Sequence, residues 1–205
     1  MLNKNAYNKI AAQWAESRDR SFVSELVVDF ADRVRPNGAI LDIGCGTGHP
    51  LASWLAEKGY RVKGIDASEK MIEIALSRNI KNAEFQVVDF FEYATSQKFD
   101  GILAWDSFFH FPLEKQETIY PKIAEWLHPG GYLLFTHGYE EGEIAGEMMG
   151  ENFYYSCLSK EKVMRILKEL HFEVKFIYED YKERDTDRGL VILAQKIMPK
   201  TQNAR

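Results

Sequence analysis

The sequence predicts an α/β fold, a doubly wound sheet whose strands are mostly parallel. Two observations predict it. Strand-like and helix-like segments alternate along 205 residues, a length that suits one domain with a sizeable core. An apolar strand also runs directly into a glycine-rich turn and a helix. That arrangement forms a binding site for a nucleotide-type ligand, because the helix N-terminus offers free N–H groups.

Composition narrows the class of protein. Hydrophobic residues make up 45% of the chain, so burial is not limiting, and the net charge is −5 without a basic block. The electrostatic footprint of a nucleic-acid binder is therefore missing, although a local basic patch stays open. Cys45 and Cys157 form no CxxC pair or Cys/His cluster, so no metal is expected. No signal peptide or membrane-spanning stretch is recognisable, and we expect a cytoplasmic protein.

The first half of the chain provides three strands. The apolar run Ala39–Ile43 is the first, and the helix Leu51–Ala56 follows its glycines. Arg61–Ile65 is the second strand, and the third lies near Phe85–Val88. Ser68 offers an N-cap to the helix between them, because its hydroxyl can accept a hydrogen bond from a free backbone N–H. One face of that helix carries apolar residues, which are Met71, Ile72 and Ala75.

The second half provides the rest of the sheet. Gly101–Ala104 is a short apolar run, typical of a strand that is buried on both faces. Pro121 is tolerated in a first helical turn and starts a helix through Leu127. Gly130-Gly131 ends that helix, and Tyr132–Thr136 is the fifth strand.

The C-terminal segments predict one helix and two strands. Ser159 caps a helix with an apolar stripe, which is Val163, Ile166, Leu167 and Leu170. A strand follows in which apolar and polar residues alternate, with Phe172, Val174, Phe176 and Tyr178 on one face. A charged turn, Glu179–Arg188, leads to the last strand, Leu190–Ala194. Because this connection is short, the two strands are expected to be antiparallel.

The glycine loop is the most informative motif. Gly44, Gly46 and Gly48 alternate after the first strand, and Asp42 precedes them. Glycine lets the backbone turn sharply and approach a ligand closely. The spacing is G-x-G-x-G and not the G-x-G-x-x-G of dinucleotide binders. Together with the acid before the loop, it points to S-adenosylmethionine rather than NAD.

Five motifs in order resemble the class I S-adenosylmethionine-dependent methyltransferases, over nearly the whole chain from Tyr7 to Lys196. They are Ile40–Gly48, Val62–Asp66, Phe85–Phe90, Phe99–Ala104 and Leu127–Leu134. Each motif alone is weak evidence for this family. All five in this order along one chain are strong evidence. The resemblance implies a Rossmann-like, seven-stranded sheet that ends in the antiparallel pair. It also implies one methyltransferase domain, 1–205, with an N-terminal helical lid at 1–35 and a substrate-side insertion at 137–158.

The resemblance implies transfer of a methyl group to a small-molecule nucleophile by in-line displacement. A methyltransferase that acts on RNA or protein is one alternative, and a non-catalytic S-adenosylmethionine-binding protein is another. A nicotinamide oxidoreductase would have the same strand-loop-helix arrangement, but the glycine spacing and the Leu-His-Pro-Gly-Gly turn disfavour that class. The Asn-Pro-Pro-Tyr-type motif of amino-methylating nucleic-acid enzymes is absent. The acceptor atom and the oligomeric state do not follow from the sequence.

Several side chains are candidates for the cofactor. Asp66 lies 22 residues after Gly44, where two carboxylate oxygens can hold both ribose hydroxyls. Asp42 either accepts from the methionine amino group or orders the loop. Arg18 either pairs with the cofactor carboxylate or lies in solvent. The resemblance implies a larger set, which is Tyr7, Trp14, Asp42, Gly44, Cys45, Gly46, Gly48, Asp66, Ala67, Met71, Asp89, Phe90 and Trp105.

For some of these residues an ordinary structural role stays open. Tyr7 and Trp14 suit the packing face of an amphipathic helix as well as a lid. Asp89, whose family match accepts from the adenine amino group, also reads as a surface acid. Phe90 reads as a core aromatic residue as well as a ring that flanks the adenine.

Substrate residues are expected in two places. His110 follows the fourth strand and is the candidate general base, because unperturbed histidine titrates near neutrality; a structural, hydrogen-bonded histidine is the alternative. The insertion leaves the carboxyl end of the fifth strand, where ligands bind in open α/β sheets. It is either a wall for an apolar or aromatic substrate or a solvated acidic loop. The expected substrate residues are His110, His137, Met148, Tyr154 and Tyr155.

Overall fold

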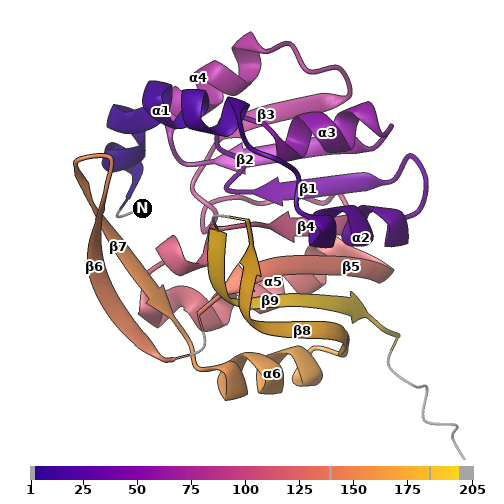
Figure 1. Ribbon diagram of the computed structural model, residues 1–205. Helices are drawn as coiled ribbons and strands as arrows, with labels where there is room; N and C mark the ends of the chain where they lie inside the picture. The colour runs from indigo at the N-terminus through magenta and orange to yellow at the C-terminus, as the bar shows by residue number, and fades with distance from the viewer. Residues whose placement is uncertain (1–2, 139, 185, 199–205) are drawn as a thin grey trace, which may run out of the picture.

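A computed structural model describes residues 3–138, 140–184 and 186–198. Its main sheet has seven strands in the order β3-β2-β1-β4-β5-β9-β8 (Figure 1). The strands are β1 (Ala39–Ile43), β2 (Arg61–Asp66), β3 (Ala83–Val87), β4 (Phe99–Ala104), β5 (Leu127–His137), β8 (Phe172–Glu183) and β9 (Thr186–Lys196). The first five are parallel, and β9 runs antiparallel to β5 and β8. The predicted fold class is confirmed.

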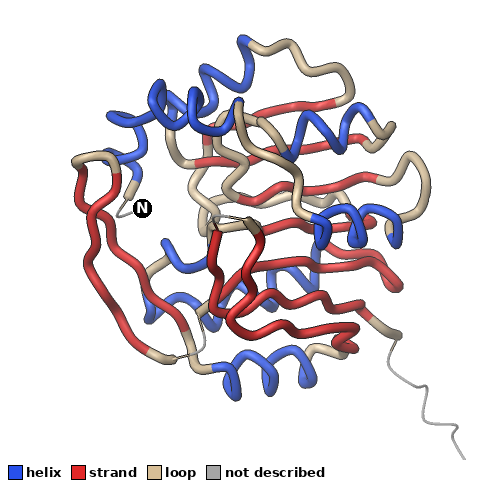
Figure 2. Tube along the Cα trace, in the orientation of Figure 1, coloured by secondary structure: helices blue, strands red, loops and turns tan. Residues whose placement is uncertain are grey.

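Helices cover both faces of this sheet, as Figure 2 shows. The helices of the described residues are α1 (Lys4–Asp19), α2 (Glu25–Arg33), α3 (Leu51–Glu57), α4 (Glu69–Ser77), α5 (Ile119–Trp126) and α6 (Lys160–Glu169), with 3₁₀ turns at Phe108–His110 and Leu113–Thr118. Ser68 and Ser159 cap α4 and α6 as predicted, since each hydroxyl accepts a backbone N–H of the first turn. Helix α2, which Ser24 caps, lies within the helical segment expected at 1–35, although its bounds were not predicted.

The core divides between the two faces because successive strand residues point in opposite directions. Ile40 and Leu103 pack with α2 and α3, whereas Leu41 and Ile102 pack with α5 and α6. Strand β4 is buried at every position, as its apolar run predicted. A buried side chain of this size contributes about 1.5–3 kcal/mol to the stability of the fold, so the sheet is a rigid base for the loops at its edge.

Two predicted boundaries are wrong. Helix α5 ends at Trp126, and Gly130-Gly131 lies within β5, because Leu127 already pairs with Phe99 of β4. The charged segment 179–188 is mostly strand, with Tyr181 paired to Arg188. Pairing of β9 with β5 stops at Leu190. The charged side chains beyond it therefore lie on a two-stranded ribbon that water can reach, where charge does not prevent strand pairing.

The insertion forms a two-stranded hairpin, β6 (Gly142–Met148) and β7 (Glu151–Cys157), which the sequence analysis did not predict. Its turn residues, Met149 and Gly150, both have positive φ, as in the type I′ turn of tight hairpins. Such turns favour Asn-Gly, so Met-Gly is a weak signal. In Figure 1 the hairpin stands beside the main sheet, and its turn meets α1.

Helix α1 and the hairpin share a small hydrophobic cluster of their own. Ala6, Ile10 and Phe153 are buried in it, with Tyr7 and Trp14 packed alongside. Helix α2 instead belongs to the sheet core. The predicted lid at 1–35 therefore divides into a helix on the hairpin and a helix on the sheet. Within the described ranges, no helix has the length and apolar character needed to cross a membrane.

Candidate functional site

The site lies where the sheet changes its winding direction. Strands β2 and β4 flank β1 on opposite sides, so the loops that leave β1 and β4 diverge and open a crevice at their carboxyl ends. Gly44 has φ +74° there, and a Cβ at this position would lie 2.6 Å from the Cβ of Ser107. Only glycine fits, because both the backbone angle and the neighbouring loop exclude a side chain.

A first cavity of about 140 Å³ occupies this crevice under α1. It collects most of the predicted cofactor residues, which are Tyr7, Trp14, Asp42, Gly44, Cys45, Gly46, Asp66, Ala67, Met71, Phe90 and Trp105. Gly48 and Asp89 lie outside its wall. A Cβ at Gly48 would lie 2.8 Å from the Phe85 ring, so this glycine allows close packing against β3. The Asp89 carboxylate accepts the N–H of Phe91 at 2.9 Å.

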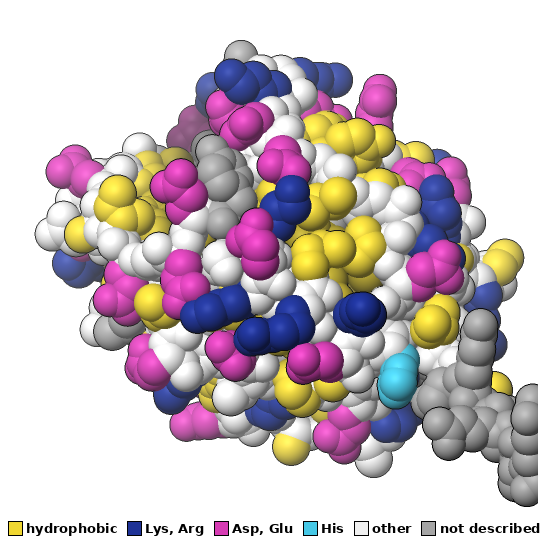
Figure 3. All heavy atoms as spheres, turned by 90° about the horizontal axis from the view of Figure 1, so that it is seen from below, with side chains coloured by type: hydrophobic (Ala, Val, Ile, Leu, Met, Phe, Trp, Pro, Cys, Tyr) yellow, Lys and Arg dark blue, Asp and Glu magenta, His cyan; other side chains and the backbone are white. Residues whose placement is uncertain are grey.

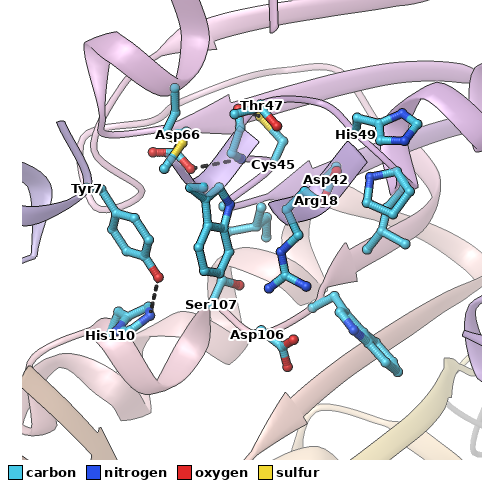
Figure 4. A pocket seen from close by; sticks show the side chains of 18 of the residues that line it. Tyr7, Arg18, Asp42, Cys45, Thr47, His49, Asp66, Asp106, Ser107 and His110 are labelled. Carbon is cyan, nitrogen blue, oxygen red and sulfur yellow. Dashed lines mark hydrogen bonds between the residues drawn. The ribbon is translucent and has the colours of Figure 1, made fainter. Parts of the chain in front are cut away.

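Two acidic side chains, Asp42 and Asp66, lie beside the glycine loop in the wall of the first cavity. Asp66 accepts the N–H groups of Gly46 at 3.0 Å and Ser68 at 2.8 Å (Figure 4). Asp42 is 3% exposed, and its carboxylate accepts no hydrogen bond from a described residue. Burial, with the charge of Asp66 as a smaller contribution, raises the pKa of Asp42 to about 7. A cation in the cavity would satisfy Asp42 and favour its charged form.

Two hydroxyls and one guanidinium are also available to a ligand. Thr47 Oγ1 and Ser107 Oγ are buried in the cavity wall and have no hydrogen-bond partner among the described residues. Arg18 lies over the Trp14 ring, with its Cζ 4.1 Å from the ring centroid, and points into the cavity. It makes no ion pair or hydrogen bond with a described side chain, so its N–H donors can receive an anion. The sequence analysis missed Thr47 and Ser107, although Thr47 lies within the glycine loop.

A second cavity of about 680 Å³ opens between the hairpin, α1 and the ends of β5 and β9. Four of the predicted substrate residues line it, which are His110, His137, Met148 and Tyr155. Tyr154 does not. Its hydroxyl donates to Glu143 and accepts the N–H of Leu113.

The two cavities share a wall, which we call the junction. It consists of Tyr7, Trp14, Arg18, Asp106, His110, Thr186 and Arg188. A group bound in one cavity can therefore reach a group bound in the other. Helix α1, the loop and 3₁₀ turn after β4, and β9 supply these residues, so three distant parts of the chain build it.

Asp106 and Arg188 form the framework of the junction. Asp106 has φ +55°, and Arg188 donates to both of its carboxylate oxygens at 2.8 Å. The guanidinium also lies over Trp105, with its Cζ 4.6 Å from the ring centroid. The sequence analysis missed this pair because it placed Arg188 in a turn. Its position became visible only once β9 was known to extend to Thr186.

Both buried histidines are uncharged at neutral pH. Burial lowers the pKa of His110 to about 4, and that of His137 to about 4 as well. His110 Nε2 lies 2.7 Å from the Tyr7 hydroxyl, and its Nδ1 lies 2.7 Å from Asn3 Nδ2. Nδ1 of His137 lies 2.6 Å from the carbonyl oxygen of Gly138. His110 is thus hydrogen-bonded as expected for a structural histidine, which was the alternative to a general base. It also lines both cavities.

Comparison with known proteins agrees with this fold. A family model described as a methyltransferase domain matches residues 40–131, which carry most of the first cavity's floor. A protein of Geobacillus sp. (strain WCH70), named as a methyltransferase, is 28% identical over 161 residues, 71% of this chain and 64% of its own length. Phosphoethanolamine N-methyltransferase 1 of Zea mays is 32% identical over 120 residues, 55% of this chain.

The solved structures include the Burkholderia thailandensis 1,6-didemethyltoxoflavin-N1-methyltransferase with S-adenosylhomocysteine. Its TM-score is 0.70 at 17% identity, over 97% of this chain and 91% of that one. Our chain spans less than two thirds of the Geobacillus relative and 23% of the maize relative.

The fold and the crevice define an α/β protein that holds a nucleoside-type ligand at the edge of its sheet. The domain match over residues 40–131 and the curated relatives support a class I S-adenosylmethionine-dependent methyltransferase, and the solved structure agrees with that fold.

Proposed function

We propose that this protein transfers a methyl group from S-adenosylmethionine, bound in the first cavity, to a small molecule bound in the second. The observation that carries the proposal is the junction, because seven residues line both cavities. Donor and acceptor would meet there. Holding two reactants in line can supply several kcal/mol of the barrier, about 7–11 at the extreme.

The polar groups of the first cavity match the polar groups of S-adenosylmethionine. Asp42 has no hydrogen-bond partner among the described residues and would accept from the amino group. Asp66 keeps acceptor capacity on both oxygens and would bind the ribose hydroxyls. Arg18 would receive the carboxylate. NAD fits poorly, since its negatively charged pyrophosphate would lie near the carboxylate of Asp42.

When bound, S-adenosylmethionine supplies a methyl group on a positively charged sulfur. The protein's own residues then align the reactants and exclude water. The aromatic rings of Tyr7 and Trp14 face both cavities, and aromatic faces attract cations. Arg188 fixes Asp106, and so the shape of the junction.

Three observations favour a small acceptor. A volume of about 680 Å³ is in the range of small-molecule sites. The Zea mays relative is named for phosphoethanolamine, and the Burkholderia structure contains 1,6-didemethyltoxoflavin. Basic and acidic side chains lie side by side on the face seen in Figure 3. That mixture gives no support to an RNA acceptor, which would favour a basic patch.

Calorimetry and a labelled-donor screen test the proposal. We expect S-adenosylmethionine and S-adenosylhomocysteine to bind and NAD not to bind. Purified protein with labelled donor is then expected to label members of a panel of small organic acids, phenols and amines. Binding without transfer to any small molecule, RNA or protein would favour a non-catalytic S-adenosylmethionine-binding protein. Binding of NAD without S-adenosylhomocysteine would contradict both interpretations.

A further inference from the structure

Asn3 is a buried amide whose orientation is fixed by its neighbours. It is 2% exposed and lies between the start of α1 and strand β7. Its Oδ1 accepts the backbone N–H of Tyr154 at 2.8 Å, and its Nδ2 donates to the Tyr154 carbonyl at 2.7 Å. The reverse orientation would place oxygen against oxygen and nitrogen against N–H. The nitrogen of Asn3 therefore faces the carbonyl.

The second hydrogen of this nitrogen determines where His110 carries its proton. Asn3 Nδ2 lies 2.7 Å from His110 Nδ1, and an amide nitrogen only donates, so Nδ1 must offer its lone pair. The carbonyl of Tyr154 lies farther from Nδ1, at 3.3 Å. Because burial keeps the ring uncharged, the single ring proton is on Nε2.

The ring proton on Nε2 determines whether the Tyr7 hydroxyl donates or accepts in its hydrogen bond with His110. His110 Nε2 is 2.7 Å from Tyr7 Oη, so the N–H donates and the hydroxyl oxygen accepts. The hydroxyl makes no other hydrogen bond with a described residue, so its own hydrogen is available to the junction. Burial also raises the pKa of the phenol above its usual range, so Tyr7 keeps that hydrogen. Figure 4 shows the hydrogen bond between Tyr7 and His110 as a dashed line.

We infer that Asn3 is a positioning residue which, through His110, makes Tyr7 a hydrogen-bond donor at the junction, and that the methyl acceptor there is an anionic oxygen. The inference rests on the proposed function. An amine nitrogen has one lone pair, which it needs for the methyl carbon. A carboxylate or phenolate oxygen has further lone pairs, so one can attack while another accepts from Tyr7.

The chemistry balances without a general base. An oxygen lone pair forms a bond to the methyl carbon while the carbon–sulfur bond breaks, and its electron pair stays on sulfur. A negative oxygen and a positive sulfur become a neutral ester or ether and a neutral thioether. No proton has to leave. This suits a junction in which His110 Nδ1 is occupied by Asn3 and Asp106 is occupied by Arg188.

Histidine ¹⁵N NMR tests the role of Asn3 directly. We expect His110 of the wild-type protein to be protonated on Nε2 alone, with the signal assigned by its loss in His110→Gln. In Asn3→Ala we expect Nδ1 to gain the proton, because it then faces only the Tyr154 carbonyl. Lys9→Gln is the matched control, since it removes a different contact of α1 with the hairpin, that with Glu151. A wild-type ring protonated on Nδ1 overturns the inference even if Asn3→Ala does not fold.

Matched acceptors test the class of substrate. Benzoate, which is an anion at neutral pH, is compared with aniline, whose nitrogen lone pair is free there, using labelled donor. We expect transfer to benzoate, reduced about ten- to a hundredfold in Tyr7→Phe, which loses a hydrogen bond to a charged group. Transfer to aniline alone would overturn the oxygen acceptor and leave methyl transfer standing. Bound S-adenosylhomocysteine without any transfer would count against the proposed function, and the NMR result would still decide the role of Asn3.

Discussion

The floor of the first cavity and the roof formed by α1 with the hairpin are built in different ways. The floor consists of loops that follow parallel strands, and each loop carries its signal within a few residues, as in the glycines of Ile40–Gly48. The roof joins Asn3 to Tyr154, which are 151 positions apart. Local sequence therefore specifies the floor, and tertiary contact specifies the roof.

The energetics differ in the same way. The floor is attached to a sheet whose central strand β4 is wholly buried. The roof has a small cluster around Phe153 and a partly exposed ion pair of Lys9 with Glu151. An exposed pair of this kind is worth about 0–1 kcal/mol. Changes in the floor should therefore weaken cofactor binding strongly, whereas changes in the roof should loosen the acceptor site.

The largest effect is expected from Gly44→Ala. The new Cβ would meet Ser107 at 2.6 Å in a backbone conformation that alanine rarely adopts. We expect the affinity for S-adenosylhomocysteine, measured by calorimetry, to fall about a hundredfold or more. Gly130→Ala is the control, since it also has positive φ but meets nothing within 4 Å. Equal losses in both variants would show that backbone strain, not the close approach, is responsible.

Asp66→Ala should weaken the cofactor about ten- to a hundredfold, because hydrogen bonds to a charged group contribute about 1.5–3 kcal/mol. The same calorimetric titration on Asp89→Ala provides the comparison. Asp89 follows the neighbouring strand β3 but lies outside the cavity wall. A native melting profile with unchanged affinity in Asp66→Ala would make Asp66 a loop-ordering residue. An equal loss of affinity in Asp89→Ala would show that Asp89 also belongs to the cofactor site.

A smaller effect on cofactor binding is expected from Phe153→Ala. Removing this ring costs about 3–5 kcal/mol in a packed core, more than a two-stranded hairpin can lose and stay closed. We expect hydrogen exchange in Gly142–Met148 and Glu151–Cys157 to accelerate, while S-adenosylhomocysteine affinity falls less than tenfold. In the wild-type protein the same amides should slow when cofactor product and acceptor bind. Strong, equal protection in every state would make the roof a fixed wall.

The sequence predicted the floor well and the roof poorly, for a physical reason. A strand, a glycine turn and an acid lie close together in the chain, so Gly44 and Asp66 can be recognised without a structure. Asp106 and Arg188 lie 82 residues apart, and nothing near either predicts their pairing. Asn3 is oriented by the backbone of Tyr154, whose side-chain hydroxyl contacts Leu113 instead. No pattern of side chains could indicate that contact.

Titration of the cofactor against pH tests the central claim most directly, since Asp42 has no partner until a cation arrives. Its folded-state pKa, about 7, is above the usual value for aspartate. Burial of its charge therefore lowers the free energy of unfolding of the unliganded protein as pH rises from about 4 to about 7. A cationic cofactor lowers this pKa, so binding below pH 7 must release a proton.

We predict that the affinity for S-adenosylmethionine, measured by calorimetry, rises about tenfold per pH unit from 5.5 to 7, since one pKa unit is 1.36 kcal/mol. His110 and His137 are already neutral in this range. Binding enthalpies measured in buffers of different ionisation enthalpy should confirm the release, and Asp42→Asn should make the affinity independent of pH. An affinity that stays constant from pH 5.5 to 7 in the wild-type protein, without proton release, would contradict the account.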